Sequence, residues 1–326
     1  MSPSLRALLV GAIDYAGLFP PARLPLEEAF RNHLEYRATP ESWMLGRFIC
    51  PLNLLEELLS FVEEIERAGS PVTLSVLGQG GSNAGDFLEN FRADLAAIEA
   101  FKEKIGSHFV VDTIETRLPD DLEHCTQSDG AVVAAAADLI ESRALPLTPY
   151  YECRLPSKWE STLECAIGQI ALANRQASQS NRYCRPAGFK LRCGGIEAKA
   201  FPPADQVAFA ISKCCEMGVP FKFTAGLHHP LRHFDAQLQT TMHGFLNVLA
   251  AGVVADAIQG KKEESIRQII LDEKSEDFRF DNDGLRWQQH FVSLAKIVQA
   301  RTRLVKSFGS CSFDEPREDL RALGLL

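Results

Sequence analysis

The sequence predicts an α/β protein, a single TIM-like (β/α)8-type barrel, on three observations. After Glu27, short apolar runs alternate with amphipathic helical stretches, and each such unit takes about 30 to 40 residues, as in a parallel sheet. The six or seven units carry no G-x-G-x-x-G fingerprint, which favours a closed barrel over a doubly wound sheet. The length of 326 residues suits an α/β barrel that folds as one domain, residues 1–326.

Seven segments are predicted to be strands because they are short, apolar and bounded by polar or turn residues. They are Leu45–Cys50, Val72–Leu77, Phe109–Ile114, Pro149–Cys153, Gly188–Cys193, Pro220–Thr224 and Leu304–Phe308. Helical spacing of apolar residues predicts helices after most of them. These helices are Leu54–Arg67, Ala84–Lys104, Trp159–Gln176, Ala204–Met217 and Leu238–Ala257.

Three segments lie outside this alternation. Residues 1–40 are expected to form a helix, a loop and a second helix packed across one mouth of the barrel. Residues 260–290 are polar without a clear period, and we expect a surface excursion there. The C-terminus predicts a capped helix with Pro316 near its first turn, ending in an apolar segment, residues 323–326, that docks on the domain.

Composition narrows the class of protein and its partners. A formal charge of -9 and a pI near 5.5 argue against nucleic acid, which needs a basic face. No apolar run is long enough to cross a membrane. The nine cysteines include no C-x-x-C pair, which favours reduced thiols in the cytoplasm over disulfides or a structural zinc cluster. The expected partner is a small anionic molecule, and a homo-oligomer is compatible with the sequence.

The most informative pattern is a short segment that occurs twice. Lys190 stands between Phe189 and Leu191, Lys222 stands between Phe221 and Phe223, and each lysine has a glycine four positions later. Alternate side chains of a strand face opposite ways, so both lysines are expected on one face of a sheet. Unpaired cations are costly inside a protein, and such an arrangement usually binds an anion or performs chemistry.

Further polar side chains fall near the ends of predicted strands and in the following loops, where barrel active sites lie. Glu152 is a candidate proton carrier beside the lysines. The N-terminal loop Asp14–Pro21 is either a rigid plug or a lid that offers Asp14 to the site. The candidate substrate-binding residues are Arg47, Glu115, Arg192, His229, Asp14 and Ser310.

Two interpretations of the lysines stay open. In the first, cations exceed carboxylates, an anionic substrate balances them, and one lysine attacks a carbonyl while the other lowers its pKa. In the second, Glu152 forms a structural ion pair with Lys190 or Lys222. The first predicts that Lys222→Met preserves or raises the melting temperature, and the second predicts a clear loss of stability.

The segment 186–227 is similar to the active-site half of class I aldolase barrels such as deoxyribose-phosphate aldolase. The shared layout is a lysine strand, a glycine-rich turn, a helix, Gly-Val and a second lysine strand followed by glycine. The resemblance implies that Lys190 forms a Schiff base and that Lys222 tunes it. Gly309-Ser310 would then serve as the phosphate-binding turn. Arg192 stands where the family has a small polar residue, and His228-His229-Pro230 replaces its continuation.

Histidines form a competing group. His228, His229 and His233 crowd one segment after the second lysine strand, and His229 and His233 would share a face of a helix, as zinc ligands often do. His228 is the candidate general acid or base. Cys193 and Cys311 lie nearest to predicted strand ends, but no histidine is paired with either in sequence, so a nucleophilic thiol is not favoured.

These patterns favour an enzyme of the lyase class. Lysine-assisted carbon–carbon lysis, or enolate or iminium chemistry, on a small anionic carbonyl metabolite is expected, with Lys190, Lys222, Glu152 and His228 as catalytic residues. This interpretation needs no cofactor. The alternatives are a barrel hydrolase or isomerase that uses Zn²⁺ or another divalent metal on the histidines, with His229 and His233 as ligands, and a ligand-binding barrel without turnover.

Overall fold

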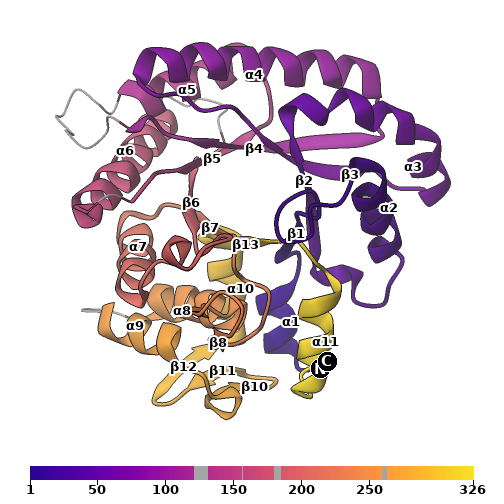
Figure 1. Ribbon diagram of the computed structural model, residues 1–326. Helices are drawn as coiled ribbons and strands as arrows, with labels where there is room; N and C mark the ends of the chain where they lie inside the picture. Colours follow the sequence, from indigo (N-terminus) through magenta and orange to yellow (C-terminus); the bar gives the residue numbers. More distant parts are fainter. Residues whose placement is uncertain (121–130, 156, 180–184, 259–262) are drawn as a thin grey trace. The chain divides into compact units, whose positions relative to one another are not determined.

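The computed structural model describes residues 1–120, 131–155, 157–179, 185–258 and 263–326. Eight parallel strands follow one another in the order β1-β13-β7-β6-β5-β4-β3-β2 and close into a barrel (Figure 1). The predicted TIM-like (β/α)8 architecture is therefore confirmed. Within the described residues no helix is both long and apolar enough to cross a membrane.

The barrel strands agree closely with the seven predicted segments. Their bounds are β2 (Leu45–Pro51), β3 (Val72–Leu77), β4 (Phe109–Arg117), β5 (Thr148–Glu152), β6 (Gly188–Arg192), β7 (Phe221–Thr224) and β13 (Val305–Ser310). Differences are confined to the strand ends. Short apolar runs between polar residues are enough to locate strands that are buried on both faces.

The eighth strand was not predicted. β1 (Ile13–Tyr15) lies within residues 1–40, between α1 (Pro3–Leu9) and α2 (Leu26–Arg37), and pairs with β13 through Ile13 and Phe308. Asp14 does not lie in a loop as expected, because it is the middle residue of this strand and is fully buried. Three residues are too few for an alternating pattern to be recognised.

The chain forms two compact units. The first unit comprises residues 1–46 and 191–326, and the second comprises residues 47–190. In the second unit, α4, α5 and α6 lie along the outer side of β4 and β5 (Figure 1). The helices of this unit are α3 (Val62–Ala68), α4 (Ala84–Ile105), α5 (Ala131–Ser142) and α6 (Trp159–Gln179), with short 3-10 turns at Leu52–Leu54 and Glu56–Phe61.

The first unit contains helices and two small antiparallel sheets besides its barrel strands. Its remaining helices are α7 (Ala204–Met217), α8 (Phe245–Ala257), α9 (Glu263–Leu271), α10 (Leu294–Arg303) and α11 (Asp314–Ala322), with 3-10 turns at Ser42–Met44, Ala198–Ala200 and Ser275–Asp277. Its small sheets pair β8 (His233–Asp235) with β9 (Thr240–Met242), and β10 (Phe278–Phe280), β11 (Gly284–Trp287) and β12 (His290–Ser293) in that order.

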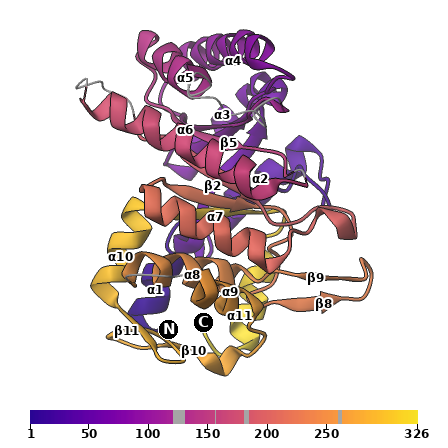
Figure 2. The ribbon, with the colours of Figure 1, turned by 90° about the vertical axis from the view of Figure 1, so that its left-hand side faces the viewer.

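Two of the predicted segments in this unit are wrong. The helix expected from Leu238 begins only at Phe245, since the preceding residues form the β8–β9 hairpin, which projects from α8 and α9 in Figure 2. The segment 260–290, expected to be irregular, contributes α9 and two strands within its described part, and Trp287 is almost completely buried. Apolar residues there are few but are placed at helical or strand spacing.

The end of the chain is partly as predicted. α11 carries Pro316 in its first turn. The apolar end that was expected to dock is not buried, since Leu323 is 38% exposed and Leu325 is only half-buried. The C-terminal helix is instead attached through Leu320, which is fully buried.

The prediction that all cysteines are reduced is wrong for Cys165. This residue of α6 is disulfide-bonded. The other described cysteines form no disulfide: Cys50, Cys153, Cys193, Cys214, Cys215 and Cys311. Irregular spacing gave no indication of this bond because disulfide geometry depends on distance in the fold, not in the sequence.

The repeated glycine after each lysine has a steric cause. Gly194 follows β6 and Gly226 follows β7, and a Cβ placed on Gly226 would lie 2.9 Å from the Cα of Gly194 and 2.7 Å from the Phe201 ring. The amide of Cys193 also donates to the carbonyl oxygen of Thr224 at 2.8 Å. The two loops therefore touch through glycine backbones, which leaves no room for a side chain.

We predict that Gly226→Ala destabilises the protein by about 1–3 kcal/mol more than Gly218→Ala. Both glycines have φ of +70°, but a Cβ at Gly218 meets nothing within 4 Å. The left-handed conformation costs alanine about 1 kcal/mol at either site, so the difference isolates the close approach to Gly194. Urea unfolding of the two variants measures it, and equal losses would contradict the steric explanation.

Candidate active site

Lys190 lies in a network of charged residues inside the second unit. Its Nζ is 3.0 Å from Oε2 of Glu115 and 3.0 Å from Oε2 of Glu152, and the Ser75 hydroxyl donates to the other oxygen of Glu115 at 2.6 Å. We call these four residues the Lys190 cluster. They come from the consecutive strands β3, β4, β5 and β6, so neighbouring strands of the barrel supply one residue each.

The alternation read from the sequence places these side chains correctly. Phe189 and Leu191 are almost completely buried beside Lys190, and on β7 the rings of Phe221 and Phe223 meet edge to face at 5.6 Å. Because residues i and i+2 share a face of a strand, the apolar neighbours pack on one side and the lysines point to the other. The predicted contact between Lys190 and Glu152 is confirmed.

The two carboxylates keep Lys190 protonated. Burial alone would lower its pKa, but the charges of Glu115 and Glu152 and their hydrogen bonds outweigh burial and raise the pKa. The side chain of Glu115 is 1% exposed and that of Glu152 is 16% exposed. Solvent therefore reaches the cluster at Glu152, while Glu115 is enclosed.

Lys222 has a different partner in the first unit. Its Nζ donates to Oδ2 of Asp14 at 2.6 Å, and the Ser307 hydroxyl donates to the same oxygen at 2.5 Å. All three side chains are buried, on the adjacent strands β7, β1 and β13. The expectation that the lysines are unbalanced cations is wrong, because Lys222 pairs with Asp14 and Lys190 pairs with Glu115 and Glu152.

The other candidate substrate-binding residues are dispersed. Arg47 lies in the first half of β2 and binds Asp112 through two hydrogen bonds of 2.6 and 2.9 Å, away from the strand ends where barrel active sites lie. Arg192 ends β6 and is exposed. The Ser310 hydroxyl accepts from the amide of Ser312 at 3.4 Å, and acidic residues occupy the first turn of the nearby α11, which disfavours a phosphate.

The histidines separate into two groups in the first unit. The Nδ1–H group of His229 donates to Oδ2 of Asp319 at 2.5 Å, and the His229 ring meets that of His233 edge to face. They do not share a helix as predicted, since His233 opens the strand β8. Both line an open pocket of about 360 Å³ with Arg232, Glu273 and the end of α11.

His228 points to residues that the sequence did not connect with it. Its Nδ1 lies 3.6 Å from Sγ of Cys311 and 3.4 Å from a carboxylate oxygen of Glu315. Burial lowers the pKa of His228, but hydrogen bonds to Cys311 and Glu315 raise it overall, to about 9. Cys311 directly follows β13, and only the adjacency of β13 and β7 in the barrel brings it to His228.

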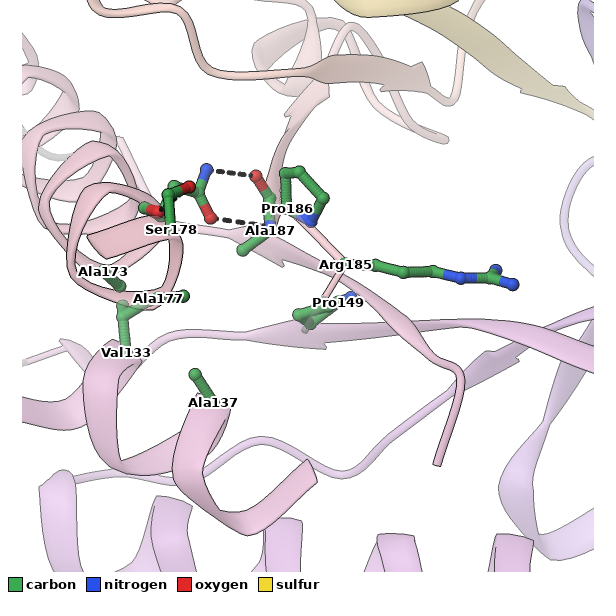
Figure 3. Close-up of a pocket in the computed structure, with 10 residues that line it drawn as sticks. Val133, Ala137, Pro149, Ala173, Ala177, Ser178, Arg185, Pro186 and Ala187 are labelled. Atoms are coloured by element: carbon green, nitrogen blue, oxygen red, sulfur yellow. Dashed lines mark hydrogen bonds between the residues drawn. The ribbon is translucent and has the colours of Figure 1, made fainter. Parts of the chain in front are cut away.

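A small pocket lies elsewhere in the second unit. It holds about 50 Å³ between α5, α6 and the chain entering β5 and β6. The side-chain nitrogen of Asn174 donates to the carbonyl oxygen of Ala187, and its side-chain oxygen accepts from the amide of Ala187 (Figure 3). Its other lining side chains are mostly alanine, proline and valine, and Figure 3 shows Arg185 directed away from them. It offers no group for chemistry and lies at the starts of the strands.

We predict that Lys222→Met lowers stability by about 3–5 kcal/mol, because the buried Asp14 carboxylate loses its counter-charge. This reverses the outcome expected for an excess of cations. The double variant Lys222→Met/Asp14→Asn should recover part of the loss, since no buried charge remains. Denaturant unfolding measures each change.

The control is Lys104→Met, which breaks an exposed pair with Glu56 and should change stability by less than about 1 kcal/mol. A Lys222→Met protein as stable as the wild type would contradict the ion-pair interpretation.

Comparison with known proteins does not assign the chain to a family. No family model matches its sequence, and no curated protein is significantly similar to it. The resemblance to class I aldolases stays a prediction, and the functional proposal rests on the geometry of the site.

Proposed function

We propose that this chain is an enzyme that removes a proton next to a carbonyl group and stabilises the resulting enolate. The observation that supports this most strongly is the Lys190 cluster, in which one ammonium lies 3.0 Å from two carboxylates of unequal exposure. An isomerase reaction and a carbon–carbon lyase reaction both pass through such an enolate.

Glu152 is the proposed general base. It ends β5, its side chain is partly exposed, and it contacts Lys190 through one carboxylate oxygen. In the proposed step, Glu152 takes the proton from the carbon next to the carbonyl, and the C–H electrons move into the enolate. A side chain placed for such a transfer accelerates it by about 10²–10⁴-fold.

Lys190 is the proposed electrostatic partner. Its raised pKa keeps the ammonium charged, so it can donate a hydrogen bond to the oxygen on which negative charge develops. The same charge argues against the iminium branch of the original expectation, since only a neutral amine attacks a carbonyl. Glu115 is enclosed and bonded to both Ser75 and Lys190, and it holds the ammonium in place.

An anionic substrate finds a cation in the loop after β5. Arg154 lies two positions beyond Glu152, and its side chain is 63% exposed. Its Nη1 is 3.2 Å from Oδ2 of Asp120. A carboxylate or phosphate of the substrate would replace Asp120 on this guanidinium. Small 2-oxo acids and phosphorylated ketones therefore match the proposal.

The proposal is tested by hydrogen exchange. Wild-type protein in D₂O should exchange the protons next to the carbonyl of pyruvate or dihydroxyacetone phosphate faster than buffer does, as followed by NMR. We predict that Glu152→Gln slows the exchange by about 10²-fold or more. Glu99→Gln, which breaks the ion pair with Arg143 in the same unit, should leave the rate unchanged.

Borohydride separates this mechanism from Schiff-base chemistry. Reduction in the presence of either probe should leave Lys190 unmodified in the peptide mass spectrum. A covalent adduct on Lys190, or no exchange with either compound, would contradict the enolate proposal. An exchange rate that Glu152→Gln leaves intact would mean that the cluster is only a structural ion pair.

For the compartment, we propose the cytoplasm because six of the described cysteines form no disulfide. The disulfide at Cys165 weighs against this, because reducing compartments disfavour such bonds. Fractionation of the native cells, with immunodetection of the protein, decides the matter, and recovery outside the cytoplasmic fraction would contradict the proposal.

A further inference from the structure

Three potential metal ligands meet in the first unit. His228 follows β7, Cys311 follows β13, and Glu315 lies in the first turn of α11. One ligand atom from each lies within 4.8 Å of the others, and within the part of the chain that the structure describes no other three residues of these types do so. β7 and β13 pair directly, so both loops leave the same edge of the sheet, where barrel enzymes carry their sites.

The distances fit a tetrahedral ion. Zinc bonds of about 2.3 Å to sulfur, 2.0–2.1 Å to nitrogen and 2.0–2.2 Å to oxygen imply separations of about 3.5 Å between nitrogen and sulfur and about 3.4 Å between nitrogen and oxygen. The structure has 3.6 Å from Nδ1 of His228 to Sγ of Cys311 and 3.4 Å from Nδ1 to Oε2 of Glu315.

The donor set selects the class of metal. A thiolate, an imidazole and a carboxylate together suit Zn²⁺, whereas Mg²⁺ and Ca²⁺ take oxygen ligands. Cys311 is 8% exposed and the His228 side chain 14% exposed, but Glu315 is 51% exposed. Solvent can therefore reach an ion at the side of Glu315, which leaves a fourth position for water or a substrate oxygen.

Neighbouring contacts hold the ligands in position. The amide of Glu315 donates to the hydroxyl of Ser312 at 3.1 Å, which fixes the start of α11 next to Cys311. Asp314 accepts from the Tyr36 hydroxyl at 2.8 Å and pairs with Arg317 within α11. The first turn of the helix is thereby attached to α2. The position of the Glu315 backbone is therefore fixed by contacts of neighbouring residues, and the Glu315 carboxylate is left to bind an ion.

We propose that His228, Cys311 and Glu315 bind one Zn²⁺ ion with an open fourth coordination position. The site differs from the ligands expected from sequence, since His229 bonds to Asp319 and His233 contacts His229. It is independent of the proposed enolate chemistry, whose residues all belong to the second unit. An ion with three protein ligands can polarise a carbonyl or lower the pKa of a bound water.

Metal titration of the full-length protein tests the site. Chelator-treated wild-type protein, kept reduced, should bind one equivalent of Zn²⁺. With Co²⁺ it should develop the near-ultraviolet absorption of a thiolate ligand and the visible bands of a tetrahedral ion. Cys311→Ser should abolish the thiolate absorption. Cys311→Ser, His228→Gln and Glu315→Gln should each weaken Zn²⁺ binding by at least about tenfold, because loss of a residue that only supports a ligand already costs that much.

Matched controls keep the test decisive. Cys215→Ser removes a half-buried thiol of α7 that forms no disulfide, and His229→Gln removes the histidine next to His228. Neither change should alter the affinity or the spectrum. Glu315→Gln alters a half-exposed residue and remains informative if His228→Gln fails to fold. Substoichiometric Zn²⁺ in the wild type, a thiolate band that survives Cys311→Ser, or loss of binding in His229→Gln would each overturn the proposal.

Discussion

Each lysine inside the barrel must have a counter-charge, and most of the site follows from that requirement. A buried ammonium loses its hydration, and only a close carboxylate offsets the cost. Lys222 finds Asp14 on β1, and Lys190 finds Glu115 and Glu152 on β4 and β5. Because these partners come from different strands, the ion pairs help to define which strands lie together.

The two lysines are alike in sequence but unlike in their surroundings. Lys222 and Asp14 are enclosed and form a close ion pair, an arrangement suited to holding strands together. In the Lys190 cluster one ammonium contacts two carboxylates, and Glu152 is the more exposed of the two. A carboxylate that solvent can reach beside a fixed cation is suited to proton transfer, so two similar sequence segments place their lysines in different surroundings.

The sequence predicted the features that depend on local pattern. Strands buried on both faces, the alternation of Phe189, Lys190 and Leu191, and the helix that ends at Met217 all follow from neighbours in the chain. The features it missed depend on partners far away: β1 is too short to show a period, and Asp14 reveals its role only beside Lys222.

The same limit applies to the metal ligands. His228 and Cys311 lie 83 positions apart, and no spacing rule joins them. Cys311 was noted for its place near a strand end, and His228 for its place after β7, but only the order of the barrel strands puts the two loops together. The histidine pair at four-residue spacing was misleading, because a hairpin follows where a helix was expected.

The position of β1 has a consequence for how the protein is made. Ile13 pairs with Phe308, so one of the first segments to be synthesised can form its strand pairing only after one of the last has been synthesised. On a ribosome, the barrel cannot close until nearly the whole chain has been synthesised, and contacts between such distant segments carry a large loop-closure cost that slows folding. Until then Asp14 remains hydrated and Lys222 lacks its partner, so the burial of that ion pair and the closing of the barrel belong to the same late event.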